Sequence, residues 1–304
     1  MSVRRSPNRK HDREVFYKYM SVSTAKAVLR GRRLRWSSPI LFNDPFDVPR
    51  ELAQGISSSE IQKAVGEHFA DLLQHPPDHL GELSPKVAFV VNAARGATPE
   101  LIKQMVEAAV DVANEQAKQT TSANFEAIRE MWRDWIPDFR ILCLCSSPEK
   151  TSMWYHYADQ YTGIVLELRC SDERDSPWLA AEPVLYPVDT PPLLTPAGWG
   201  RLMSLQPEIA IRRLLHEYTF NKTPDWSYEE EWRITSFKRP DDVGHFTDYR
   251  VAPLDFSKVF LGPHISDQDR LEMLRLLIGD LSHVEAFQAR IESDRHFSFA
   301  PLTL

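Results

Sequence analysis

Residues 226–237 carry the sequence WSYEEEWRITSF, in which three consecutive glutamates with flanking aromatic residues lead into a predicted strand. Its second half, residues 231–237, has the alternation that is typical of a β-strand. If the strand begins near Glu229, then Glu229, Glu231 and Arg233 point to one face of the sheet. Two carboxylates held this close repel each other, which raises the pKa of at least one of them. Such a pair suits proton transfer or the binding of a ribose diol. The alternative is a solvated acidic strand edge with Arg233 as its partner, which the flanking aromatic residues disfavour.

Working outward from this strand, the hydrophobic periodicity predicts an α+β fold. The strands do not alternate regularly with helices, so a doubly wound parallel sheet is not expected. We expect a single domain over residues 14–304, with a helical insertion at about 59–135, after a disordered basic tail over residues 1–13. The predicted strands are 15–20, 34–37, 139–146, 163–169, 183–186, 231–237, 246–251, 258–261, 284–292 and 296–303. The predicted helices are 23–30, 59–74, one that begins at Thr98, one that ends near Pro137, 207–220 and one that begins at Ser266.

Composition limits the possible partners of the chain. The 304 residues are 42% hydrophobic and 26% charged, which is ordinary for a globular protein. The formal net charge of -7 argues against a large nucleic-acid footprint. A local basic patch in the predicted tail is expected to be solvated, and its alternative is a contact with nucleic acid or a protein partner. This patch consists of Arg4, Arg5, Arg9, Lys10 and Arg13.

Cysteine use and hydropathy predict the compartment. The three cysteines are an odd number and give no disulfide framework. No apolar run approaches the roughly 18 residues of a membrane span, and the N-terminus lacks the pattern of a secretory signal. We therefore expect a cytoplasmic protein with no membrane partner.

The segment at residues 42–47 contains Asn-Asp-Pro-Phe-Asp, which predicts a turn. The side chains of Asn43, Asp44 and Asp47 offer oxygen atoms that can hold a sugar hydroxyl or a divalent cation. The alternative is a purely structural turn between apolar anchors.

Two further segments combine aromatic and polar residues. Trp154 and Tyr157 lie on one face of a predicted short helix, where they form either core packing or a wall that stacks against a nicotinamide or adenine ring. Earlier in the chain, Lys18 precedes Tyr19 in the first strand, and the alternative for Lys18 is a solvent-facing lysine at the sheet edge. No glycine-rich phosphate-binding loop is present in the sequence.

Taken in order, these four segments resemble the bacterial domain-of-unknown-function family 2971. The matching residues are Lys18-Tyr19, residues 43–47, Trp154 with Tyr157-Ala158 and Gly163, and Tyr228 to Arg233. The resemblance covers roughly residues 14–240. The family name supplies no activity.

A second resemblance, to the ADP-ribosyltransferases, does imply an activity. ADP-ribosyltransferases have a split, mostly antiparallel β-sheet, a basic residue on the first strand, a serine segment on a second strand and a late Glu-x-Glu. This chain is similar in order, with Lys18, then Ser37-Ser38, then Glu229-x-Glu231. The resemblance implies that Glu231 holds the nicotinamide ribose and promotes an oxocarbenium-like state, and that Glu229 orients the acceptor. The chain departs from the family in having Lys18 where those enzymes have Arg or His, an incomplete serine triplet and a large helical insertion.

The sequence therefore predicts an NAD-consuming enzyme, either an ADP-ribosyltransferase or an NAD glycohydrolase, serving as a toxin or phage-defence effector. NAD is the expected substrate, the acceptor is a protein or nucleic acid, and no metal is expected. The predicted catalytic residues are Glu231 and Glu229, and the predicted substrate-binding residues are Lys18, Tyr19, Ser37, Ser38, Asn43, Asp44, Asp47, Trp154, Tyr157, Tyr228 and Arg233.

Two alternatives stay open at this point. The first is a metal-dependent nuclease or phosphodiesterase in which Asp44, Asp47, Glu229 and Glu231 bind Mg²⁺. The second is a non-catalytic partner-binding module, in which the acidic and aromatic segments form a structural hydrogen-bond network.

Overall fold

The computed structural model describes residues 5–112, 116–294 and 296–303, and the chain divides into two compact units. The first unit contains Met1–Asn43, Pro137–Tyr186 and Lys222–Leu304, and the second contains Asp44–Ile136 and Pro187–Asn221. The sequence led us to expect one domain with a helical insertion at about 59–135. The structure extends that helical part by a second, later stretch of chain, and each unit is described separately below.

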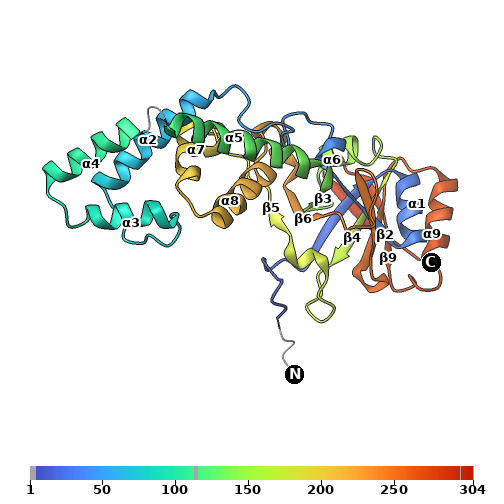
Figure 1. The fold of residues 1–304 in the computed structure, drawn as a ribbon. Helices are drawn as coiled ribbons and strands as arrows, with labels where there is room; N and C mark the ends of the chain where they lie inside the picture. The colour runs from blue at the N-terminus through green and yellow to red at the C-terminus, as the bar shows by residue number, and fades with distance from the viewer. Residues whose placement is uncertain (1–4, 113–115, 295, 304) are drawn as a thin grey trace. The chain divides into compact units, whose positions relative to one another are not determined.

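Within the described residues, ten strands of the first unit form one sheet (Figure 1). The main path runs β10-β9-β8-β4-β1-β3-β2-β7, and β6 and β5 continue from β3. Each of these pairings is antiparallel except that of β8 with β9, so the predicted α+β class with a mostly antiparallel sheet is confirmed. The strands are β1 Val15–Met20, β2 Arg33–Ser37, β3 Phe139–Cys145, β4 Ile164–Arg169, β5 Glu182–Pro183, β6 Glu231–Phe237, β7 Phe246–Arg250, β8 Phe256–Leu261, β9 Glu285–Ile291 and β10 Phe297–Leu302.

The sheet divides at strand β3. Strand β6 pairs with β3 along its whole length, and therefore occupies one of its two edges. Strands β1 and β2 share the other edge and contribute one residue pair each, Tyr17 with Cys145 and Ser37 with Ile141. Cys143 lies midway between these two pairs, and neither β1 nor β2 pairs with it. Strands β1 and β2 thus separate at the centre of the sheet.

The two faces of this sheet are covered differently. Helices α1 (Val22–Gly31) and α9 (Asp267–Leu276) lie side by side over one face, as Figure 1 shows. The core beneath them includes Phe16, Leu142, Leu166, Ile234 and Val259. The short helix α6 (Thr151–His156) packs on the opposite face, over Tyr19, Trp154, Val165 and Phe260. Alternate residues of the strands supply these two cores, as the pleat of a β-sheet requires.

Capping residues explain where several helices begin. Ser266 caps α9 as predicted, and its side chain accepts a hydrogen bond from the Asp269 backbone. Helix α1 is capped by Ser21 rather than by Ser23. Either serine satisfies the sequence pattern for an N-cap, and Ser21 has the extended backbone that a cap needs.

The second unit consists of helices. They are α2 Ser58–Gln74, α3 Pro85–Ala94, α4 Pro99–Val112, α5 Gln116–Trp135, α7 Pro196–Met203 and α8 Pro207–Phe220. Helices α3 and α7 were not predicted, because each is short and follows a proline-containing loop. Helix α7 packs closely on α2 through Gly200, where an added Cβ atom would lie 2.5 Å from the Ala64 carbonyl oxygen. This contact ties the later stretch of the second unit to the earlier one.

Residues 5–13 make specific contacts, whereas the sequence predicted a disordered tail over residues 1–13. Arg9 forms an ion pair with Asp172 at 2.9 Å, and only 6% of the Arg9 side chain is exposed. The Lys10 backbone donates to the Leu179 carbonyl at 2.8 Å. The carboxylate that neutralises Arg9 lies 163 residues later, which charge patterning along the sequence does not reveal. Residues 1–4 of the predicted tail lie outside the described residues.

Within the ranges that the structure describes, no helix is both long enough and apolar enough to cross a membrane.

We predict that Gly163→Ala destabilises the first unit. Gly163 directly precedes strand β4, and an added Cβ atom would lie 2.4 Å from the Met20 carbonyl oxygen and 2.7 Å from the Ala158 carbonyl. Backbone atoms on both sides cannot move independently, so we expect a loss of about 1–3 kcal/mol in the free energy of unfolding, measured by urea denaturation.

Gly31→Ala is the matched control. Gly31 is the last residue of α1, and a Cβ atom added there would meet no atom within 4 Å apart from its chain neighbours and the backbone of its own helix, so this change should be neutral or slightly stabilising. Equal stabilities for the two variants would contradict the close packing at Gly163.

Candidate functional site

The three consecutive glutamates lie in a turn rather than in a straight strand. A 3-10 helix, η5 (Pro224–Glu229), ends at Glu229, and β6 begins at Glu231. Glu230 between them has a left-handed backbone with φ of 43°. The predicted strand over residues 231–237 is confirmed, whereas the supposition that it could begin near Glu229 does not hold. The turn still places the side chains of Glu229 and Glu231 on the same side, while Glu230 is exposed and pairs with Lys150.

Two buried cations hold this carboxylate pair. The Lys222 ammonium lies 2.6 Å from Glu229 and 3.5 Å from Glu231. The Arg233 guanidinium donates to both oxygens of Glu231, from Nε at 2.8 Å and from Nη2 at 2.9 Å. The four residues are Lys222, Glu229, Glu231 and Arg233, and none is more than 7% exposed. We call them the four-charge cluster. Its formal charges sum to zero, as is usual for charged groups that are buried together.

The environment moves the pKa values of the two carboxylates in opposite directions. Burial raises the pKa of Glu229, the Glu231 charge raises it further, and the charge of Lys222 only partly opposes this. Burial also acts to raise the pKa of Glu231, but the Arg233 charge and hydrogen bonds, with Lys222, outweigh it and lower that pKa to about 2. Glu231 is thus held as an anion, whereas Glu229 is the group that takes up a proton more readily.

Aromatic hydroxyl groups complete the surroundings of the pair. The Tyr157 hydroxyl donates to Glu229 Oε1 at 2.6 Å, and burial together with the Glu229 charge raises the pKa of Tyr157. The Tyr186 hydroxyl accepts a hydrogen bond from the Glu231 backbone N–H at 3.0 Å. The Lys222 ammonium also lies 4.5 Å from the centre of the Trp226 ring. Tyr157 and Arg233 were predicted site residues, and the structure brings both to the carboxylate pair.

The division of the sheet lies next to this cluster. Cys143 pairs with Arg233 across β3 and β6, and its thiol also forms a hydrogen bond with Glu231. On the other edge of β3, the Lys18 ammonium donates to the Cys143 carbonyl oxygen at 2.7 Å. Lys18 therefore reaches into the gap between β1 and β2, one residue of β3 away from the carboxylate pair.

Other predicted residues have structural roles in the first unit. Trp154 is fully buried, and its indole N–H donates to the Pro148 carbonyl at 2.8 Å, so its ring belongs to the core. The Tyr19 hydroxyl donates to the Ser147 carbonyl. The Ser38 hydroxyl is buried and caps a 3-10 turn, η1 (Pro39–Leu41), by accepting from the Ile40 backbone. Ser37 is a paired residue at the end of β2.

Tyr228 lies in the 3-10 helix η5 that precedes the carboxylate pair. Its ring is half-buried, with its centre 6.0 Å from the Trp226 ring and 6.2 Å from the His156 ring. Trp226 and Tyr228 place an aromatic surface directly before Glu229 in the sequence.

The Asn-Asp-Pro-Phe-Asp segment forms the predicted turn. The boundary between the two compact units lies inside this segment. Asn43 ends the first stretch of the first unit, whereas Asp44 and Asp47 belong to the second unit. Asp44 Oδ1 accepts from the Phe46 backbone at 2.9 Å, and Asp47 Oδ1 accepts from the Val48 backbone at 2.8 Å. Local hydrogen bonds of this kind are typical of aspartate in turns. The role of these residues in substrate binding stays a prediction.

Sequence reasoning did not identify three members of the site. Lys222, Tyr186 and Cys143 lie in unrelated segments, and each is ordinary in its own sequence context. One signal was available for Lys222: two adjacent carboxylates that are buried need cations beyond Arg233, and Lys222 is the nearest preceding lysine.

Comparison with known proteins adds no family. No family model, no curated protein and no solved structure matches this chain. The resemblances noted from the sequence motifs therefore stay predictions. Across the part of the chain that the structure describes, no group of three or more His, Cys, Asp or Glu side chains is arranged to hold a metal ion.

We predict that Glu231→Gln and Glu229→Gln change the pH dependence of stability in opposite ways. The pKa of Glu231 falls from 4.5 in the unfolded chain to about 2, so its contribution of about 3 kcal/mol is complete above pH 4.5 and is lost toward pH 2. The raised pKa of Glu229 makes its contribution complete below pH 4.5, and this contribution is lost as the pH rises through the raised value.

Urea unfolding between pH 3 and pH 7 measures both effects. Relative to the wild type, Glu231→Gln should lose most stability at neutral pH, whereas the penalty of Glu229→Gln should shrink as the pH rises. Glu230→Gln is the control and should change the free energy of unfolding by less than about 1 kcal/mol, because half of the Glu230 side chain is exposed. Parallel pH profiles for the first two variants would contradict the opposite pKa directions.

Proposed function

We propose that this protein is an NAD-consuming enzyme that breaks the bond between nicotinamide and ribose, either as an ADP-ribosyltransferase or as an NAD glycohydrolase. One observation carries the proposal: two adjacent buried carboxylates have pKa values shifted in opposite directions, next to the division of the sheet. Environments that separate the pKa values of two carboxylates give one the role of anion and the other the role of proton carrier.

The reaction assigns a different task to each glutamate. As the glycosidic bond breaks, nicotinamide leaves with the bonding electrons and positive charge develops on the ribose carbon. Glu231, held as an anion, stabilises that charge. The acceptor oxygen, from water or a macromolecule, then forms the new bond to this carbon, and Glu229 receives its proton. Atoms and charge balance in this scheme, and the products are nicotinamide and an ADP-ribosylated acceptor or free ADP-ribose.

The neighbours of the glutamates support these roles. Arg233, Lys222 and the Cys143 thiol together supply about the four hydrogen bonds that a carboxylate accepts, so a ribose hydroxyl would replace one of them at Glu231; the Lys222 contact at 3.5 Å is longer than either Arg233 contact. Tyr157 and Lys222 orient Glu229. Lys18, at the division of the sheet, supplies positive charge for the phosphates of NAD. Because Glu229 and Glu231 are 2% and 5% exposed, substrate binding requires movement of the residues around them.

The split arrangement of β1, β2, β3 and β6 also supports the comparison with ADP-ribosyltransferases. The Lys18 side chain from β1, Ser37 at the end of β2 and Glu231 at the start of β6 all adjoin β3. This is the order that the sequence resemblance implies. The expected biological setting is a bacterial toxin or phage-defence effector that modifies a protein or nucleic acid.

A second candidate is a non-catalytic partner-binding module, and one observation favours it. Both oxygens of Glu229 and both oxygens of Glu231 already have partners within the protein. Such saturation is also the property of a structural ion-pair network.

The test is loss of NAD from a solution of the purified protein in EDTA, with and without cell lysate. We expect metal-independent loss of NAD that Glu231→Gln reduces by at least about 100-fold, because the variant lacks the anion that stabilises the ribosyl cation. Glu230→Gln is the matched control one residue away and should retain the wild-type rate.

Lysate dependence would indicate transfer to an acceptor, and turnover without lysate would indicate hydrolysis. If the folded wild-type protein consumed no NAD under either condition, the partner-binding module would be the better account. Equal rates for Glu231→Gln and the wild type would contradict the role of Glu231.

A further inference from the structure

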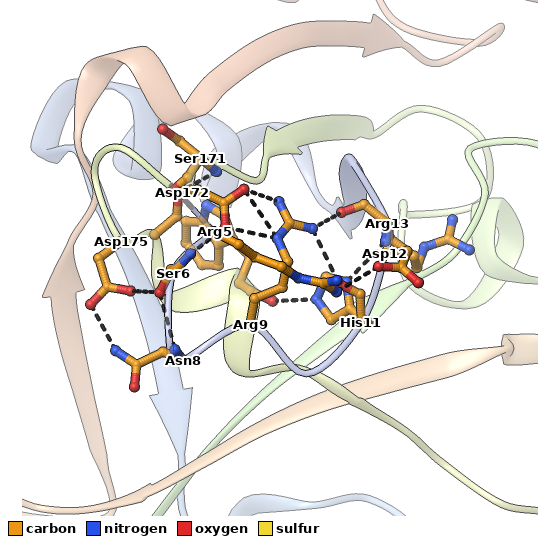
Figure 2. A network of polar contacts seen from close by, with 12 residues as sticks. Arg5, Ser6, Asn8, Arg9, His11, Asp12, Arg13, Ser171, Asp172 and Asp175 are labelled. Carbon is orange, nitrogen blue, oxygen red and sulfur yellow. Dashed lines mark hydrogen bonds and ion pairs between the residues drawn. The ribbon is translucent and has the colours of Figure 1, made fainter. Parts of the chain in front are cut away.

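Residues 6–13 form an extended segment, here called the strap, that polar contacts hold against the rest of the first unit. Figure 2 shows Arg9 directed at Asp172, where Nε and Nη2 both lie 2.9 Å from carboxylate oxygens. The Ser6 backbone donates to Asp172 Oδ1 at 2.9 Å, and the Ser6 hydroxyl donates to Asp175. A bidentate arginine–carboxylate pair is among the strongest polar contacts in proteins, so Arg9 fixes the first half of the strap.

His11 fixes the second half of the strap in one protonation state. Its Nε2 lies 2.8 Å from the Trp178 carbonyl oxygen, and its Nδ1 lies 3.0 Å from the Arg13 backbone nitrogen. A carbonyl oxygen only accepts a hydrogen bond, so Nε2 carries the hydrogen. A backbone N–H only donates, so Nδ1 must be unprotonated. The fastened strap therefore contains neutral histidine in a single tautomer.

Aromatic residues also pack against the His11 ring. Its centre lies 4.9 Å from the ring of Phe16 on β1 and 5.4 Å from the ring of Trp232 on β6, both edge to face. These contacts hold the ring with Nδ1 directed at the Arg13 backbone. Protonation of Nδ1 would turn that hydrogen bond into a contact between two donors.

We propose that His11 is a proton-operated latch: the strap is fastened while Nδ1 is unprotonated, and the half from His11 to Arg13 is released when Nδ1 gains a proton. The latch is distinct from the proposed reaction with NAD and does not depend on it.

Burial and the two neighbouring arginines favour the neutral form of His11. Burial lowers the pKa of His11 below 6.5, the Trp178 carbonyl opposes this, and the positive charges of Arg9 and Arg13 lower it further, with Asp12 opposing. The elements packed on the ring present Phe16, Trp232 and the Trp178 carbonyl, none of which titrates in this range. Because the pKa is lowered in the fastened state, the latch contributes fully above pH 6.5 and is lost as the pH falls through the lowered value.

Release of residues 11–13 would remove contacts that connect the strap to the turn at Glu229–Glu231. The Arg13 guanidinium donates to the Ser146 carbonyl and lies 5.6 Å from the Trp232 ring centre. The Ser146 hydroxyl in turn donates to Glu230 at 2.5 Å. Trp232 follows Glu231 directly in β6, on the opposite face of the sheet from Glu231 and Arg233. The fastened strap thus packs against the start of β6 on the face opposite Glu231 and Arg233.

The test follows the strap by NMR between pH 7.5 and pH 5. In the wild type, ¹⁵N shifts of the His11 ring should show a protonated Nε2 and a bare Nδ1 at pH 7.5, with a titration midpoint below 6.5. Exchange of the Arg13 amide hydrogen, corrected for intrinsic chemistry, should accelerate by about tenfold for each pH unit below that midpoint. The Ser6 amide, held by Asp172, should remain protected, because the Arg9 hydrogen bond lowers the pKa of Asp172 below 3.8.

Two variants separate the latch from other effects of pH. In His11→Asn the side-chain oxygen can accept from the Arg13 backbone two residues later but does not titrate, so protection of Arg13 should no longer depend on pH in this range. In His11→Phe the aromatic contacts remain but both hydrogen bonds are lost, so Arg13 should be unprotected throughout. A His11 midpoint at or above 6.5, or an identical loss of Arg13 protection in the wild type and His11→Asn, would overturn the proposal.

Discussion

The burial of four charges in one cluster is the constraint on which the rest of the site depends. Removing Lys222, Glu229, Glu231 and Arg233 from water is costly unless each charge is paired and hydrogen-bonded. Lys222 lies just after the end of helix α8, and Arg233 lies on β6. The left-handed backbone of Glu230 allows the side chains of Glu229 and Glu231 to reach these two cations. The backbone around residues 222–233 is therefore set by electrostatics as much as by apolar packing. The same pairing that makes burial possible also separates the pKa values of the two glutamates, which is the property that chemistry at this site would use.

The sheet gives this cluster its position. Strand β3 is the element that β1, β2 and β6 all adjoin, and nearly all of its residues are buried. Where β1 and β2 diverge, the Cys143 carbonyl has a lysine ammonium as its partner instead of a strand. A backbone group that is buried and unpaired would be unfavourable, so Lys18 stabilises the division. On one face of β6, His11 and Arg13 of the strap over residues 6–13 pack against Trp232. On the other face, Lys222 pairs with Glu231, so residues from outside β6 contact both of its faces.

Much of the fold could be predicted from periodicity and caps, and the exceptions have physical reasons. Strands β1 and β6 and helix α8 were predicted with the bounds observed, because alternation and helical spacing are local properties. Helices α3 and α7 were missed, since short helices depend on tertiary packing that no local pattern reports. Glu229, Glu231, Arg233 and Tyr157 were predicted as site residues and lie together in the structure, whereas Trp154 belongs to the core and Lys222 was not predicted. The contacts of Arg9 and His11 were likewise invisible, because their partners lie 163 and 167 residues away in sequence.

We propose that Glu229 and Glu231 differ in protonation and together form the reaction centre. The most direct measurement is a ¹³C NMR titration of the glutamate side-chain carboxyl groups, with and without NAD. We expect Glu229 to titrate above 4.5 and Glu231 near 2, and we expect NAD to shift both signals while leaving that of Glu230 in place. Titration of both carboxylates near 4.5, with no response to NAD, would contradict this proposal.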